Sequence, residues 1–321
     1  MRAALTVVAL SLATPTVASD FRMGLPVDCT LGDTCYIQQY MDRDPGPGAS
    51  DYSCGPLSYD GHKGTDFALP TRADMTRGVN VLAVADGYVT ALRDGMADGF
   101  YSPNRDSKIA GRECGNGVLL THSDGYETQY CHLKSGSITV KNGDQVTAGQ
   151  PLGQIGLSGK TEFPHLHISL RRDGVEIDPF DRDMTPDCGS SELTHWHEPV
   201  PAYRGGGLLD VGMSDQVPLY ADVQAGTAGV DELAPDTRAL VVYGFAYGVR
   251  KGDMMRLQIT GPDGVIVQQD LEFDKTQAQA FRAIGKRRRT QNWPIGTYQS
   301  RVELLRGAQQ LGSKTARIKV E

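Results

Sequence analysis

Basic residues are outnumbered in this chain of 321 residues: 32 Lys and Arg stand against 39 Asp and Glu, for a formal net charge of −7. A nucleic-acid-binding protein is expected to carry a basic footprint, so this balance argues against a nucleic-acid partner. Long apolar runs are also scarce. The one such run, residues 3–13, is shorter than the roughly 20 residues that a transmembrane helix needs, so we predict no membrane span.

Two familiar metal-binding patterns are missing as well. None of the six cysteines stands in a Cys-x-x-Cys pair, which argues against a cysteine metal site. The chain also lacks a His-Glu-x-x-His motif, so a thermolysin-like zinc site with a glutamate base is excluded.

Residues 1–19 predict a secretory signal peptide. Arg2 precedes the apolar run, and the small residues Val17, Ala18 and Ser19 end the segment, as is typical of a cleavable leader. We therefore expect an exported protein, either periplasmic or secreted.

All six cysteines follow this segment, and an even number in an exported chain favours disulfides. The preferred pairs are Cys29–Cys35, Cys54–Cys188 and Cys114–Cys131. The last pair has the strongest support, because the turn formers at 123–125 fold the strand after Cys114 back beside the strand that carries Cys131.

Turn formers and apolar runs divide the rest of the chain into four parts. The two predicted domains among them give the chain an all-β fold. Residues 20–60 predict an irregular N-terminal segment that is tied by disulfides. Residues 61–183 alternate short apolar runs with Asp-Gly, Asn-Gly and Gly-Asp turns, which predicts an antiparallel β-domain. Residues 184–207, with several Pro and Gly, predict a linker. Residues 208–321 show regularly spaced strands and predict a β-sandwich that is immunoglobulin-like by pattern.

Candidate metal ligands stand in two short motifs. His62 and Asp66 form His-x-x-x-Asp, and His165 and His167 form His-x-His about a hundred residues later. Catalytic zinc takes three ligands from His and carboxylate side chains and keeps a fourth position for water. Because side chains alternate along a strand, both histidines of the second motif are expected on one face, roughly 7 Å apart. That arrangement suits one ligand and one catalytic neighbour, and His132 offers a further histidine between the motifs.

The chain from about 62 to 180, which carries these motifs, resembles the lysostaphin/LytM-type zinc peptidases, which cleave bacterial peptidoglycan. The matching motifs follow one another as HKGTD (62–66), VLAVADG (81–87), GNG (115–117) before His122, YCHL (130–133), GDQVTAGQ (143–150), Gly153, Gly156 and PHLHI (164–168). The resemblance implies a LytM-type catalytic domain in which His62, Asp66 and His167 bind one zinc ion. It implies catalytic roles for His132 and His165.

The resemblance also implies a peptidoglycan substrate and attack of zinc-activated water on a peptide carbonyl. One of His132 and His165 accepts the water proton and the other steadies the oxyanion; imidazole suits both roles, and their order stays open. Among possible bonds, D,D-endopeptidase cleavage of the D-alanyl–diaminopimelate cross-link is favoured. Two alternatives also stay open: a non-catalytic wall-binding regulator of other hydrolases, and a zinc amidase or protease with another bond preference.

Four further features have competing interpretations. His195 and His197 form a second His-x-His motif, but it lacks a His-x-x-x-Asp partner and is not expected to bind metal. His122 is expected to be structural. Residues 94–112 predict a long loop at the rim of the cleft. The one basic cluster, residues 286–289, is either a solvated loop or a patch through which the C-terminal domain docks on wall polymers.

Overall fold

The computed structural model describes residues 20–102, 109–184, 189 and 193–321. The predicted signal peptide, residues 1–19, lies outside these ranges. Strands dominate, and the helices that lie wholly within the described residues are the short α1 (Arg72–Arg77) and α3 (Tyr220–Ala225). The predicted all-β fold is confirmed. None of the described helices has the length and apolar character needed to cross a membrane.

The first domain is built on one antiparallel sheet with the strand order β1-β2-β9-β6-β5-β4-β7, and β10 pairs with β9. The strands are β1 (Tyr36–Gln39), β2 (Thr65–Ala68), β4 (Gly87–Arg93), β5 (Asn116–Thr121), β6 (Tyr126–Leu133), β7 (Gln145–Val146), β9 (His165–Arg172) and β10 (Val175–Ile177). A separate pair, β3 (Asn80–Leu82) and β8 (Pro151–Gln154), belongs to the same domain.

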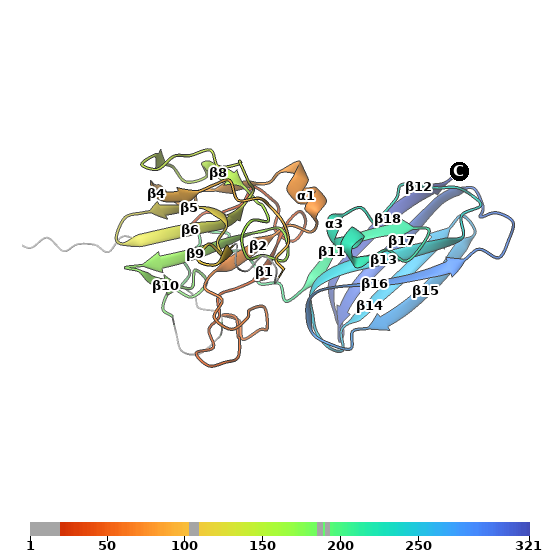
Figure 1. The fold of residues 1–321 in the computed structure, drawn as a ribbon. Coiled ribbons are helices and arrows are strands. Elements are labelled where there is room, and N and C mark those ends of the chain that lie inside the picture. Colours follow the sequence, from red (N-terminus) through yellow and green to blue (C-terminus); the bar gives the residue numbers. More distant parts are fainter. Residues whose placement is uncertain (1–19, 103–108, 185–188, 190–192) are drawn as a thin grey trace, which may run out of the picture.

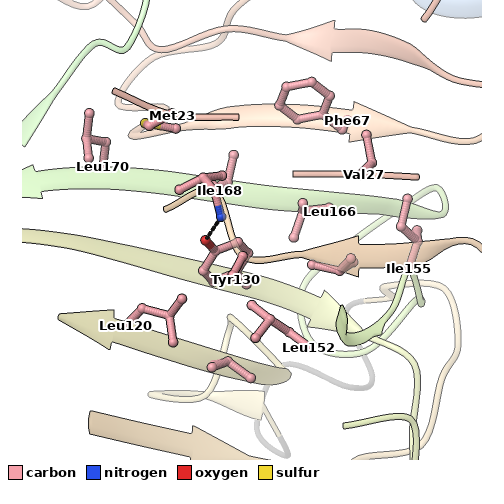
Figure 2. Packing of buried hydrophobic residues seen from close by; sticks show 14 of the residues in the cluster. Met23, Val27, Phe67, Leu120, Tyr130, Leu152, Ile155, Leu166, Ile168 and Leu170 are labelled. Carbon is pink, nitrogen blue, oxygen red and sulfur yellow. Dashed lines mark hydrogen bonds between the residues drawn. The ribbon is translucent and has the colours of Figure 1, made fainter. Parts of the chain in front are cut away.

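Alternation along the central strand β9 separates a core face from a functional face. Three side chains on one face are buried in the core, namely Leu166, Ile168 and Leu170. They pack beside Phe67 of β2 and Tyr130 of β6, as Figure 2 shows. Because successive side chains of a strand point to opposite faces, His165 and His167 lie on the other face of the sheet. Burial of the apolar set therefore fixes where the two histidines point.

Segments on both sides of the first domain contribute to the same core. Met23 and Trp196 are almost fully buried. The Met23 N–H donates to the His195 carbonyl at 2.6 Å, and the His197 N–H donates to the Met23 carbonyl at 2.8 Å. The described end of the predicted linker (184–207) thus packs against the first domain instead of spanning free space. The domain limits themselves stay a prediction.

Two of the three predicted disulfides are present. Cys29–Cys35 closes a short loop in the N-terminal segment, and Cys114–Cys131 joins the residue two positions before β5 to β6. The third prediction, Cys54–Cys188, involves a residue that lies outside the described ranges.

The C-terminal domain consists of two sheets around one hydrophobic core. The smaller sheet has the order β11 (Gly207–Ser214), β13 (Ala239–Val249), β16 (Gln277–Arg287). The larger has the order β12 (Glu232–Leu233), β18 (Gln309–Val320), β17 (Gly296–Arg306), β14 (Met254–Gly261), β15 (Gly264–Glu272). Side chains of both sheets, such as Val242 and Leu257, are fully buried in this core. The immunoglobulin-like relation of this sandwich stays a prediction.

The smaller sheet also has an apolar outer face, which packs on the first domain. Tyr243, Phe245 and Tyr247 of β13 form a cluster with Tyr36 of β1 and Ala68 of β2. The ring centroids of Tyr36 and Tyr247 lie 4.3 Å apart. Figure 1 shows β11 and α3 at this junction. The two domains therefore share a buried apolar contact and hold a defined mutual orientation.

The Cys114–Cys131 disulfide generates a stability prediction. Replacing both cysteines by Ser should lower the free energy of unfolding of the first domain by about 2–5 kcal/mol, because a cross-link constrains the unfolded chain. Urea denaturation followed by tyrosine and tryptophan fluorescence measures the change. Cys29→Ser with Cys35→Ser is the matched control, and it should cost less because its loop spans 6 residues instead of 17. Free thiols at 114 and 131 in oxidised protein would contradict the assignment.

Candidate metal centre and active site

Three side chains from two neighbouring strands and the preceding loop converge on one point. Asp66 of β2 lies directly opposite His167 of β9 in the strand register, and His62 precedes β2. His62 Nε2 lies 3.2 Å from Asp66 Oδ1 and 3.1 Å from His167 Nδ1, and the latter two atoms are 2.8 Å apart. Ligands of a tetrahedral zinc ion at about 2.1 Å stand roughly 3.4 Å from one another. The donor set and its spacing therefore fit zinc.

The surroundings of these ligands fix their orientation. His62 Nδ1 lies 2.7 Å from the Tyr40 carbonyl; a carbonyl only accepts, so this nitrogen carries the proton and Nε2 presents its lone pair. Such a second partner is typical of metal-binding histidines. Gly64 leaves space for the backbone of β9 and for the His167 ring, because a Cβ at Gly64 would lie 2.5 Å from the Ile168 carbonyl oxygen and 2.7 Å from two atoms of that ring. This close packing explains why the HKGTD motif has a glycine at position 64.

Two further histidines border the ligand set. The ring centroids of His132 and His165 lie 4.6 Å apart, and His165 Nε2 lies 3.6 Å from Asp66 Oδ1. His132 Nδ1 donates to the Ser158 carbonyl at 2.8 Å, and His165 Nδ1 donates to the Phe163 carbonyl at 2.9 Å. Both rings therefore keep a free lone pair on Nε2. The structure brings together all five residues predicted from the sequence.

Electrostatics favour neutral imidazoles beside an ionised carboxylate. Burial lowers the pKa of His165, and burial together with the neighbouring His165 and His167 lowers the pKa of His132 well below its usual value. Burial alone would raise the pKa of Asp66, but the neighbouring His62, whose own pKa is raised, and the hydrogen bond with His167 hold it well below the ordinary range. Near neutral pH, His132 and His165 are thus able to accept a proton.

An irregular backbone aims His132 at the site. Between Asn116 and Val118 of β5 the partner strand β6 accommodates an extra residue, and His132 in this bulge has a positive φ of 63°. A non-glycine residue in this region costs on the order of 1–3 kcal/mol and is held by its surroundings. Here the His132 N–H donates to the Cys114 carbonyl at 2.8 Å, and the adjacent Cys131 is cross-linked to Cys114.

Four of the five residues, all but His62, line a cleft whose cavity measures about 440 Å³. Its lining comes from several parts of the chain: Gln39, Tyr59, Asp66, Tyr101, His132, Lys160, Thr161, Glu162, Phe163, His165, His167 and Ala278. Tyr101 belongs to the predicted loop 94–112, so the described part of that loop does reach the cleft. Its N–H donates to the Thr161 carbonyl at 2.8 Å. Sequence reasoning missed Gln39 and Ala278, since neither stands in a recognisable motif.

The remaining candidates lie away from this centre. His122 is held by the Asp86 carbonyl and the Thr128 hydroxyl, both at 2.7 Å from its ring nitrogens. The His195 ring lies 3.1 Å from the Phe21 carbonyl, and within the described part of the chain only His62, Asp66 and His167 form a possible metal group. In the basic cluster 286–289, Arg288 is bonded to the Thr237 carbonyl at 3.1 Å.

Comparison with known proteins finds similarity over the part of the chain that carries these residues. Residues 60–179 match the model of Peptidase family M23. The DD-carboxypeptidase/endopeptidase Mpg of Neisseria meningitidis is 32% identical over 118 residues, or 37% of this chain and 22% of that protein. The peptidoglycan DD-endopeptidase ShyA of Vibrio cholerae is 34% identical over 109 residues, or 34% and 20%. A crystal structure of a zinc containing peptidase from Vibrio cholerae is 25% identical with a TM-score of 0.29, covering 44% of this chain and 39% of that one.

The fold and the site together define a metallopeptidase domain. This domain, residues 60–179, belongs to Peptidase family M23, which confirms the resemblance to LytM-type peptidases. The chain spans about a fifth of the length of the curated relatives it matches.

The ligand set predicts how metal content responds to mutation. His167→Ala should lose both zinc and activity, whereas His165→Ala and His132→Ala should keep most of the zinc and lose turnover. Elemental analysis of the purified protein, expected near one zinc per chain, measures the first effect. His197→Ala is the matched control. A protein emptied of zinc by His197→Ala, and not by His167→Ala, would contradict the assignment.

The close approach of Gly64 to His167 gives a second prediction. Gly64→Ala should displace the Ile168 backbone and the His167 ring and weaken zinc binding by about tenfold or more, the loss usual when a group that orients a metal ligand is changed. Competition with a chromophoric chelator measures the affinity. Gly24→Ala is the control, since its Cβ would meet only the Val84 carbonyl at 3.6 Å. Equal affinities of the two variants would show that Gly64 does not shape the site.

Proposed function

We propose that this protein is an exported zinc metalloendopeptidase that hydrolyses peptide cross-links of bacterial peptidoglycan. One observation carries the proposal: the ligand atoms of His62, Asp66 and His167 converge where His132 and His165 also face the cleft. The names of the matched relatives, which include peptidoglycan DD-endopeptidases, support the substrate class. The disulfides and the predicted signal peptide support a location outside the cytoplasm.

The chemistry follows from the groups present. Zinc, when bound, supplies a Lewis acid that polarises the scissile carbonyl and lowers the pKa of water. His132 and His165 each hold their Nδ1 proton on a backbone carbonyl, which leaves Nε2 to accept the proton of the attacking water. The ring that gains this proton then donates from Nε2 to the tetrahedral oxyanion or to the leaving amine. Asp66, kept ionised, stabilises the positive charge that develops on His165.

The arrangement argues against a non-catalytic regulator. Both catalytic histidines of the resemblance line one cleft with Asp66 and His167, and the third ligand, His62, lies beside the other two ligands. A regulator needs none of the free Nε2 lone pairs that His132 and His165 preserve. For the bond itself, we favour the D-alanyl–diaminopimelate cross-link; the zinc amidase or protease is the alternative that product analysis separates.

Product analysis tests the bond. Digestion of directly cross-linked muropeptide dimers should yield monomers that keep the bond between sugar and stem peptide, because the proposed attack is on the cross-link amide. Mass spectrometry of the products distinguishes the outcomes, with His165→Ala as the inactive control. Release of free stem peptides from the glycan would contradict the endopeptidase proposal and favour an amidase.

A further inference from the structure

The C-terminal domain contributes directly to the cleft. Ala278 at the start of β16 is exposed and lines the same cavity as His165 and His167 of the first domain. A side chain about a hundred residues beyond the peptidase domain thus borders the reacting groups. The sandwich is therefore part of the cleft wall and not a separate appendage.

Hydrogen bonds tie this wall to the edge strand β1. The Gln38 side chain is fully buried, and its Nε2 donates to the Ala278 carbonyl at 3.1 Å. Gln279 Nε2 donates to the Tyr36 hydroxyl at 2.9 Å and to Gln38 Oε1 at 3.4 Å. These bonds lie next to the apolar contact of Tyr36 with Tyr247. Polar and apolar contacts together fix β16 beside β1.

The next residue of β1 points into the cleft. Against Phe67 and Asp66 of β2, strand β1 accommodates one extra residue between Ile37 and Gln39, so Gln39 comes to stand opposite the ligand Asp66. This bulge lets Gln38 face the sandwich while Gln39 lines the cavity. Bulges commonly re-aim a side chain beside an active site.

Gln39 carries an acceptor without a donor. Its Oε1 atom is buried and has no hydrogen-bond partner among the described residues, so the amide has to turn toward the cavity before this acceptor can meet a substrate donor. A buried amide carbonyl is normally satisfied, because an unmade hydrogen bond costs free energy. The donor that a peptide substrate brings to a protease cleft is its backbone N–H.

We propose that Gln39, which follows the sandwich-bound Gln38, is a substrate-positioning residue whose side-chain amide turns toward the cavity so that Oε1 accepts a hydrogen bond from a backbone N–H of the cross-link peptide. This inference rests on the proposed peptidoglycan substrate and adds a residue and a domain to its recognition. The peptide lies between the metal-binding face of β2 and β9 on one side and the Ala278 wall on the other. Its specificity then depends on both domains.

Binding, separated from turnover, tests the proposal. In the His165→Ala background, Gln39→Met removes the acceptor at similar volume and should raise the Kd for the uncleaved muropeptide dimer about tenfold, the usual worth of one hydrogen bond. Gln39→Glu, which keeps an acceptor at this position, should restore binding. In the otherwise native enzyme, Gln39→Met should raise KM with little change in kcat, as expected for loss of uniform binding. Gln269→Met, at an exposed site on β15, is the matched control.

A second variant tests the wall itself. Ala278→Trp should fill the cleft and weaken dimer binding, while zinc content and the thermal transition stay those of the native protein. Unchanged Kd in both Gln39→Met and Ala278→Trp overturns the proposal, and so does loss of zinc in Gln39→Met, which would make Gln39 a support of the metal site. Failure of the native enzyme to cleave a dimer that it binds would instead count against the proposed function.

Discussion

Pairing of β2 with β9 in one register is the constraint on which the site depends. It places Asp66 directly opposite His167, while Phe67, Leu166 and Ile168 are buried on the opposite face. A slip of one residue would turn every side chain of a strand to the other face. The histidines would then enter the core and the leucine and isoleucine side chains would face the cleft. The same burial that stabilises the domain therefore specifies the geometry of the metal centre.

Around this pair, local irregularities complete the site. The regular strands supply Asp66, His165 and His167, whereas His132 requires a bulge and a positive φ, and Gln39 requires a bulge in β1. The Cys114–Cys131 disulfide stands next to His132, whose N–H donates to the Cys114 carbonyl. Regular pairing thus holds the candidate metal ligands, and departures from it place the side chains that we propose to act on the substrate.

The sequence predicted the parts of the site that depend on short-range patterns. His62 and Asp66 stand four residues apart, and His165 and His167 follow the two-residue repeat of a strand, so the sequence predicts that the two histidines of the strand point the same way. The hairpin between Cys114 and Cys131 can be predicted for the same reason. Docking of the sandwich cannot be predicted from the sequence, because it depends on which outward side chains of β13 meet Tyr36 and Ala68. Nor did composition reveal that Trp196, in a segment rich in proline and glycine, is a core residue.

The bond between Gln38 and Ala278 joins residues 240 positions apart in the chain. In chain order, β1 and the candidate zinc ligands all precede β16, so a chain that emerges from its N-terminus presents them first. The cleft consequently gains its second wall only when the C-terminal sandwich has folded and docked. Until then Tyr36 and Ala68 have no sandwich to cover them. Assembly of the substrate groove is thereby timed to the end of folding, and a protein interrupted before β16 carries a metal centre without a finished groove.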